Sequence, residues 1–351
     1  MRTWDSMTRS RSRNTILFTG FTILLLVCFL SDLFIGSVRI AIWDLLSIIF
    51  SSESRQPEWH IILWDFRFPR ALTAVFAGIS LSLAGLQMQT IFRNPLAGPY
   101  VLGISSGASL GVALLVMGAV IILPGRDHHF GTLGVVGAAW IGSGAVMFLL
   151  LLVSIRIKDI MTILILGILF GSITIAIVSI LQYFTHEALL KTFIVWTLGS
   201  LGNVTREQLP LLAGTLSIGV MLSLLCIKIL NTFLLGENYA RTMGVGVTTG
   251  RILLFISTSI LAGTITAFCG PIGFIGIAVP HIARLVWKTA DHRTLIPAVM
   301  LLGATGLLIS DMISQLPGSD KVLPINSITA LLGIPVVVWI VVRNRRFARI
   351  S

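Results

Sequence analysis

The segment DIMTILILGILFGSITIAIVSILQY, residues 159–183, decides the fold class of this chain. After Asp159 it carries no charged side chain, and it is longer than the roughly 20 residues that an α-helix needs to cross a bilayer. Its apolar residues run continuously and do not alternate with a period of two, so a helix is indicated and a barrel strand is not. We therefore expect a transmembrane helix here.

The rest of the chain has the same character. Of its 351 residues, 55% are hydrophobic and 11% are charged, and the mean hydropathy is +0.96, outside the range of water-soluble domains. The longest stretch without a span candidate, residues 36–64, is too short for a water-facing domain. The sequence predicts an all-α integral membrane protein, one transmembrane domain over residues 1–351, with ten spans at residues 15–36, 70–92, 97–122, 133–154, 159–183, 208–231, 250–270, 273–287, 294–312 and 325–343.

The basic residues indicate the orientation. The formal net charge of +11 does not point to nucleic acid, because Lys and Arg lie between the apolar segments. With ten spans and a cytoplasmic N-terminus, 17 of the 25 Lys and Arg fall inside and 8 outside. Counting residues 189–201 as a span would reverse this bias. We expect cytoplasmic tails at residues 1–14 and 344–351, and interfacial helices at residues 38–50 and 189–201.

The polar and small residues of the spans suggest how the helices pack. Gln87 and Gln89 must find partners, since an unsatisfied amide in hydrocarbon is costly, and interhelical hydrogen bonds are favoured over lining of a pathway. Pro280 is expected to break its helix, with His281 bonding freed carbonyls and not a metal. Small residues at four-residue spacing predict close helix contacts; they are Ala74, Gly78, Ser82, Gly103, Gly107 and Gly111. The three cysteines lie far apart in the sequence and are interpreted as packing residues; they are Cys28, Cys226 and Cys269.

The middle of the ten spans lacks Asp, Glu, Lys and Arg, and the nearest ionisable groups, Lys228, His281 and Asp311, lie toward the ends. A proton-driven carrier usually needs an intramembrane carboxylate or histidine relay. The chain also has no G-x-x-x-x-G-K-[ST] phosphate loop. The sequence therefore indicates either the membrane subunit of a larger machine, powered by another polypeptide, or a passive pore.

Four segments are too particular for a generic helix bundle. They are Arg67-Phe68-Pro69-Arg70 with the following stretch to Ala108, Leu235-Gly236-Glu237 with Ala240 and Gly244, Gly270 to Arg284, and Leu331-Leu332-Gly333-Ile334-Pro335. In this order, over residues 64–346, they resemble the FecCD-type permeases of bacterial ABC importers. These permeases take up ferric siderophores, haem or vitamin B12.

The resemblance implies the type II ABC importer permease fold in the bacterial cytoplasmic (inner) membrane. It implies a non-enzymatic subunit without cofactor, catalytic residue or metal, surrounded by membrane lipids. The implied partners are cytoplasmic ABC ATPase subunits, a periplasmic or lipid-anchored substrate-binding protein, and a second copy of the chain or a paralogous permease. An ion-coupled secondary transporter is disfavoured by the empty middle of the spans, and a passive channel by these partner motifs. The choice among the chelates stays open.

Site residues follow from the same resemblance. Arg67 and Arg70 match the arginines that dock onto glutamates of the binding protein. The residues alone favour equally an interpretation in which the two side chains only anchor the helix at the membrane interface by snorkelling. At the place of a third family arginine this chain has Gln315, which puts that contact in doubt, and nothing in the spacing shows whether Lys321 replaces it.

The loop between the sixth and seventh spans matches the helix that couples the permease to the ATPase, with Glu237, Ala240, Arg241 and Gly244. Composition alone would favour a solvated loop helix.

Asn94 and Leu96 match residues that narrow the cytoplasmic mouth of the pathway, while the bland interpretation of Asn94-Pro95 is a helix stop. The second constriction of the family has no close match at residues 159–162.

Overall fold

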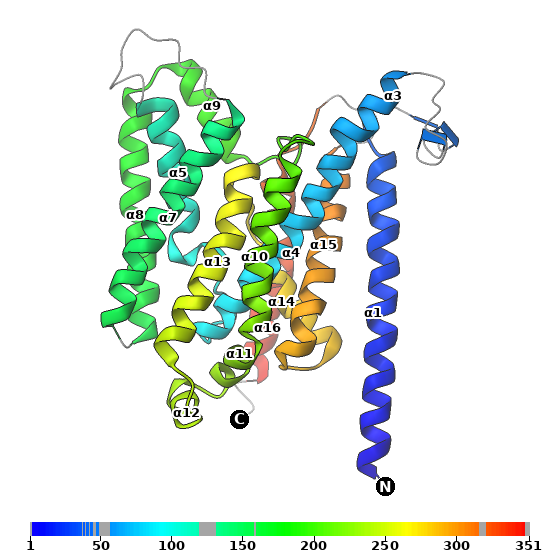
Figure 1. Ribbon diagram of the computed structural model, residues 1–351, viewed down its shortest axis with the longest axis vertical. Coiled ribbons are helices and arrows are strands. Elements are labelled where there is room, and N and C mark those ends of the chain that lie inside the picture. Colours follow the sequence, from blue (N-terminus) through cyan, green and yellow to red (C-terminus); the bar gives the residue numbers. More distant parts are fainter. Residues whose placement is uncertain are drawn as a thin grey trace.

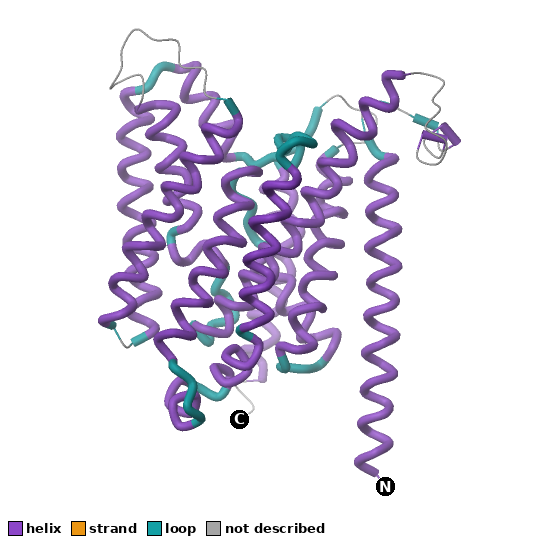
Figure 2. The backbone as a smooth tube through the Cα atoms, viewed as in Figure 1, coloured by secondary structure: helices purple, strands orange, loops and turns teal. Residues whose placement is uncertain are grey.

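The computed structural model describes residues 2–36, 57–118, 131–157, 159–315 and 321–347, with isolated positions between 38 and 48. Throughout these residues the regular structure is helical (Figure 2). The long helices run side by side between two ends of the molecule (Figure 1). One end carries α9 (Glu187–Thr197) and the other carries α12 (Glu237–Thr242), and we call them the α9 end and the α12 end.

Each of the ten predicted spans has a helix in the described residues. Six helices are long and apolar enough to cross a membrane: α1 (Arg2–Phe34, apolar from Ser12), the continuous helix Pro57–Ile91, α7 (Thr132–Arg156), α8 (Ile160–Phe184), α13 (Val247–Cys269) and α15 (His292–Ser314). The sixth predicted span is a pair, α10 (Leu209–Leu225) and α11 (Ile227–Leu234), bent by 52° at Cys226. The other three have shorter apolar helices: α5 (Ile104–Ala113) continued by η3 (Leu114–Gly118), α14 (Ile275–Trp287), and the apolar part Ile325–Trp339 of α16 (Ile325–Phe347).

The second span begins earlier than the sequence predicted. The helix starts at Pro57 with α3 (Pro57–Ile61), continues through the π-helical turn η1 (Ile62–Arg67) and becomes α4 (Phe68–Ile91). Pro69 has no N–H to donate to the preceding turn, and the π-helical turn lies directly before it. The arginine pair therefore lies inside a helix and not ahead of one.

The predicted break at Pro280 was wrong, since α14 continues through this residue. Proline leaves the carbonyl of Gly276, four residues earlier, without an intrahelical donor. That carbonyl faces Gly85 of α4 so closely that a Cβ on Gly85 would lie 1.8 Å from its oxygen. The neighbouring glycine thus gives the freed carbonyl room, and the helix continues past the proline.

Helix α4 forms the centre of the bundle, buried along most of its length and packed against α15, α13, α14 and α10. The predicted close contacts are confirmed. A Cβ on Gly78 would lie 2.2 Å from the Gly303 oxygen of α15, and one on Gly111 would lie 2.0 Å from the Ala138 oxygen of α7. Glycine is therefore required where these helices cross.

The tails and short segments complete the picture. The residues predicted as an N-terminal tail belong to helix α1, which begins at Arg2. The described N- and C-terminal ends of the chain both lie at the α12 end (Figure 1). Residues 187–197 form the short helix α9, as predicted for the region 189–201. Most of the predicted interfacial helix at residues 38–50 lies outside the described residues, as do residues 119–122 and 348–351.

Candidate functional site

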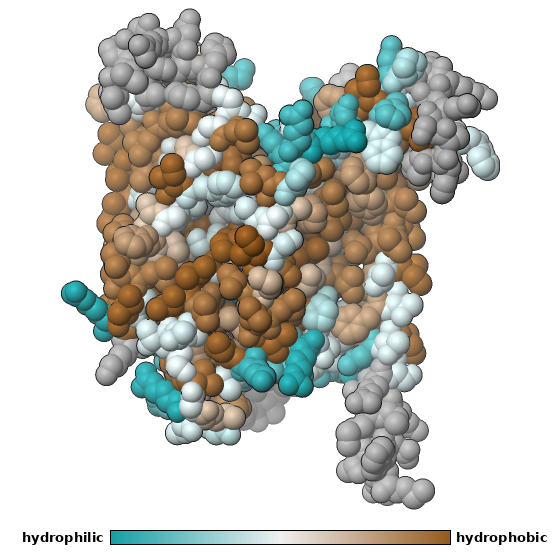
Figure 3. All heavy atoms as spheres, in the orientation of Figure 1, coloured by the Kyte–Doolittle hydropathy of each residue, from teal (hydrophilic) through white to brown (hydrophobic). Residues whose placement is uncertain are grey.

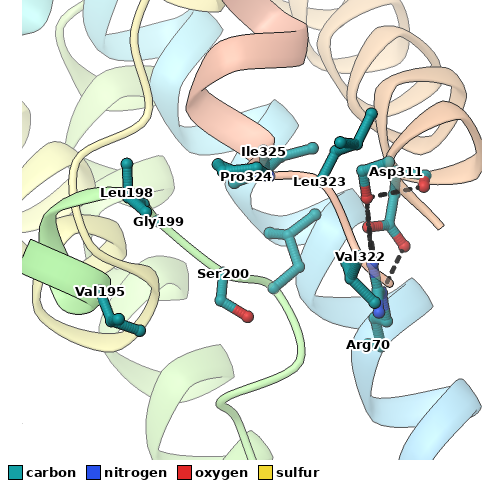
Figure 4. Close-up of a pocket in the computed structure, with 12 residues that line it drawn as sticks. Arg70, Val195, Leu198, Gly199, Ser200, Asp311, Val322, Leu323, Pro324 and Ile325 are labelled. Carbon is teal, nitrogen blue, oxygen red and sulfur yellow. Dashed lines mark hydrogen bonds and ion pairs between the residues drawn. The ribbon is translucent and has the colours of Figure 1, made fainter. Parts of the chain in front are cut away.

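At the α9 end, Arg70 forms an ion pair with a buried carboxylate. Its Nε lies 2.9 Å and 3.1 Å from the two oxygens of Asp311 on α15, and its Nη2 lies 2.8 Å from Asp311 Oδ1. Nη2 also donates to the Ser314 hydroxyl at 3.1 Å. Asp311 is fully buried, while the Arg70 side chain keeps 18% exposure. Arg70 lines a cavity of about 180 Å³ with Ser200, Pro324 and neighbouring residues (Figure 4).

A second buried acid adjoins this pair, and the sequence did not single it out. The Gln315 amide donates to Asp311 at 3.0 Å and to Asp32 of α1 at 3.1 Å, and Asp32 is only 2% exposed. Gln315, at the place of the third family arginine, is therefore buried and points inward. Lys321, the other residue considered for that role, is exposed next to the cavity residue Val322.

Arg67 faces α1 and not the outer surface. It is 7% exposed, and its guanidinium donates to the backbone carbonyls of Leu33 (2.8 Å), Phe34 (3.2 Å) and Val38. These carbonyls lie at and beyond the end of α1, where a helix leaves acceptors unsatisfied. Arg67 thereby ties α1 to the start of α4, and its docking role stays a prediction.

At the α12 end, the short predicted helix is present and fixed to the bundle. Gly236 (φ 101°) and Gly244 (φ 77°) lie on either side of α12 in the left-handed backbone region that favours glycine. Glu237 accepts from Arg251 of α13, whose Nε lies 2.8 Å from Oε1, and the Arg251 side chain is almost completely buried. Ala240 is fully buried against the chain itself.

The opposite face of this loop is open and partly apolar. Leu235, Tyr239 and Met243 are exposed, and Arg241 is exposed beside them. One face of α12 is thus held by an ion pair, and the other is an unpartnered surface of aromatic and aliphatic side chains.

The predicted gate lies in the turn after α4, also at the α12 end. Asn94 Oδ1 accepts from the Leu96 backbone N–H at 2.9 Å, a local turn that confirms the helix stop, and Leu96 is 44% exposed. His281 Nε2 bonds the Pro95 carbonyl at 2.7 Å. The turn is therefore attached to α14, and His281 bonds a backbone carbonyl as expected, but one in another segment.

The two glutamines of α4 bond between helices, as predicted. Gln87 contacts the hydroxyls of Ser223 on α10 and of Ser257 and Thr258 on α13, at 2.5–3.0 Å. Gln89 accepts from Arg284 of α14 at 2.6 Å.

The sequence missed a third network at the α12 end. His292, fully buried, bonds Thr90 Oγ1 at 2.9 Å and Asn231 Oδ1 at 2.8 Å, joining α15 to α4 and α11. Only the fold brings these positions together, so no local motif reveals them.

The described residues contain no group of three His, Cys, Asp or Glu side chains that could hold a metal ion. The charged networks lie toward the two ends of the helices, with apolar packing and hydroxyl groups between them. Such a chain is a multi-span helical membrane protein whose charged contacts lie toward its two ends.

Comparison with known proteins agrees with this class. Residues 24–343 match the model of the FecCD transport family, and the chain belongs to that family. It is 35% identical to the vitamin B12 import system permease protein BtuC of Klebsiella pneumoniae, over 98% of both chains. It is 34% identical to the hemin transport system permease protein HmuU of Yersinia pestis, over 94% of this chain and 96% of the relative.

A solved structure described as an inward-facing conformation of an ABC transporter of the metal-chelate type matches with a TM-score of 0.78 and 28% identity. The match covers 94% of this chain and 99% of that one. The predicted fold is confirmed, and the protein is a permease of a metal-chelate ABC importer family, not itself an enzyme.

Proposed function

We propose that this chain carries an iron-siderophore, haem or cobalamin-type chelate across the bacterial cytoplasmic membrane, powered by separate ABC ATPase subunits. Family membership and the relatives' substrates, vitamin B12 and hemin, support this class. In this proposal the α12 end is cytoplasmic, both termini are inside, and two copies of the chain form the pathway.

The observation that carries the proposal is the two-faced helix α12. Glu237 is held by Arg251 and Ala240 packs against the chain itself, so a force applied to the helix passes directly to α13. The exposed side chains, with Arg241 at their edge, are the kind that form the centre of protein interfaces. Gly244 then allows the sharp turn into α13. We therefore place the ATPase on this face.

The gate follows from the attachment of the Asn94 turn to α14. Because His281 bonds the Pro95 carbonyl, a displacement of α14 would carry Leu96 with it. In a dimer, two exposed Leu96 side chains facing each other would narrow the inner mouth with apolar groups. A large polar chelate would then pass only when α14 has moved.

The binding protein docks, in this proposal, at the α9 end around Arg70. The Nε and Nη2 of Arg70 donate to Asp311 and Ser314, and its Nη1 is left to meet a carboxylate of the binding protein. Nη1 points toward Gly202: a Cβ added to that glycine would lie 3.9 Å from it. Arg67 would act mainly by fixing the start of α4. Lys321, exposed nearby, is our candidate for the third contact.

Transport in proteoliposomes tests the proposal. Vesicles holding the chain and its cognate ATPase, with ATP inside and binding protein outside, should accumulate one of the three chelates. A hydrolysis-deficient ATPase serves as control and should abolish uptake. Accumulation by the chain alone under a proton gradient would identify a secondary transporter, and downhill flux without ATP would identify a channel.

A further inference from the structure

The flank of the bundle between α10–α11 and α15 carries two adjoining hollows of opposite character. The first, about 310 Å³, is lined almost entirely by apolar side chains of α4, α10 and α15, including Leu216, Met221 and Met300. The second, about 510 Å³, lies at the α12 end between α11, the start of α15 and the loop after α12, which contributes Met243, and it contains Lys228 and Arg293.

The two hollows succeed one another along the bent pair α10–α11 and along α15. Leu224 closes the apolar hollow, and Lys228 lies one helical turn further along, just past the bend at Cys226. On α15, Met300 and Arg293 are separated by about two turns, or about 10 Å. In Figure 3 the apolar flank is bordered at the α12 end by hydrophilic side chains. The apolar hollow is thus followed, toward the α12 end, by a basic pocket.

The length of the apolar hollow matches one lipid leaflet. From Ala213 to Leu224 it follows α10 for about 16 Å, at about 1.5 Å per residue. Half of a bilayer's hydrocarbon core is about 15 Å thick. An acyl chain lying along α10 would therefore end near Leu224, with its headgroup beside Lys228.

The charges of the pocket favour an anionic headgroup. Neither Lys228 nor Arg293 forms a salt bridge within the described part of the chain. Asp291, the acid of this pocket, already accepts from the Asn231 amide at 2.7 Å and from the Arg293 backbone N–H at 3.0 Å. Arg293 lies within electrostatic reach of Asp291, so Lys228 and Arg293 against one carboxylate leave the pocket with one net positive charge. Asn231 and Thr232 add polar groups to the wall.

We infer that this flank is a binding site for one anionic glycerophospholipid, with an acyl chain in the apolar hollow along α10 and the headgroup phosphate between Lys228 and Arg293. Basic pockets between transmembrane helices suit such headgroups. The bound lipid would fix the bend between α10 and α11, and α11 leads directly into the α12 loop. This inference goes beyond the proposed function, and its test does not involve transport.

Native mass spectrometry of the full chain, titrated with phosphatidylglycerol or phosphatidylcholine, tests the site. Wild type should retain one phosphatidylglycerol in preference to phosphatidylcholine. Lys228→Gln with Arg293→Gln should weaken its binding about 30-fold, because each charge near a headgroup contributes about fivefold. The control Arg156→Gln with Lys191→Gln, which removes two exposed charges elsewhere, should bind as wild type does.

A variant in the apolar hollow tests the contribution of the acyl chain separately from that of the headgroup. Ser217→Phe fills the apolar hollow with both cations intact and should also lose the lipid, whereas Gly214→Phe, on the same helix outside the hollow, should not. Equal retention of both lipids, or unchanged binding in the Lys228/Arg293 variant, would overturn the inference. So would loss of the lipid when the ATPase is added, since the pocket would then belong to the ATPase interface.

Discussion

The two ends of the molecule use charge in opposite ways. At the α9 end, Arg70, Asp311, Gln315 and Asp32 satisfy one another in a mostly buried network. At the α12 end, the ion pair between Glu237 and Arg251 fixes α12 to α13, and the exposed surface of the α12 loop is largely apolar. A charged motif in the sequence is therefore not by itself a charged surface, because its partners can come from the same chain.

The largest expected effect comes from breaking the network at the α9 end. Asp311→Asn removes the carboxylate that Arg70 contacts directly and should lower the free energy of unfolding by about 3 kcal/mol. Unfolding in mixed micelles with rising SDS measures this loss. The control is Asp65→Asn, which removes an exposed partner 3.6 Å from Arg206 and should cost less than about 1 kcal/mol. Equal losses in the two variants would show that the buried network contributes no more than a surface pair.

The next effect should appear at the α12 end, in partner binding. Glu237→Gln removes the charge-assisted bond that fixes α12, and ATPase affinity should fall about tenfold, or about 1.4 kcal/mol. Docking of the binding protein, at the other end, should not change. Exchanging the charges, Glu237→Arg with Arg251→Glu, should restore part of the affinity. A loss that the exchange leaves untouched would favour direct contact of Glu237 with the ATPase over positioning of the helix.

A somewhat smaller effect is expected from the exposed face of the same helix. Tyr239→Ser should weaken ATPase binding by about 1 kcal/mol, because truncating an aromatic anchor removes contact area from an interface. Asn238→Ser, a neighbouring exposed polar change, is the matched control and should have no effect. Surface plasmon resonance with the isolated ATPase distinguishes them. If both variants bind like wild type, the interface lies elsewhere.

The smallest effect concerns salt. Because the charge of Arg70 is compensated by Asp311, docking of the binding protein should change less than about threefold between about 0.05 and 0.5 M salt. A free surface arginine pair would give a steeper dependence. A tenfold or larger weakening would indicate that Arg70 leaves Asp311 when the partner arrives.

Much of the fold was predictable because the bilayer limits the choices. Continuous apolar runs such as residues 159–183 can only be buried helices or membrane spans. The positions of Lys and Arg then favour one number of spans over another, because each added span moves every later loop to the other side of the membrane. The π-helical start of the second span and the survival of α14 past Pro280 were not predictable. The continuation of α14 past Pro280 depends on Gly85 beside the Gly276 carbonyl, a neighbour from a distant part of the chain.

The sequence by itself determined the class of the protein, the places of its apolar helices, the glycine contacts and the short helix at residues 237–242. These follow from local properties: apolar length, residue size and the backbone freedom of glycine. Only the tertiary structure decided where the charges point. Arg67 bonds carbonyls at the end of α1, and Gln315 bridges Asp32 and Asp311, because helices far apart in the sequence end at the same level in the membrane. In a low-dielectric surrounding, such groups must satisfy one another, and the fold alone selects the partners.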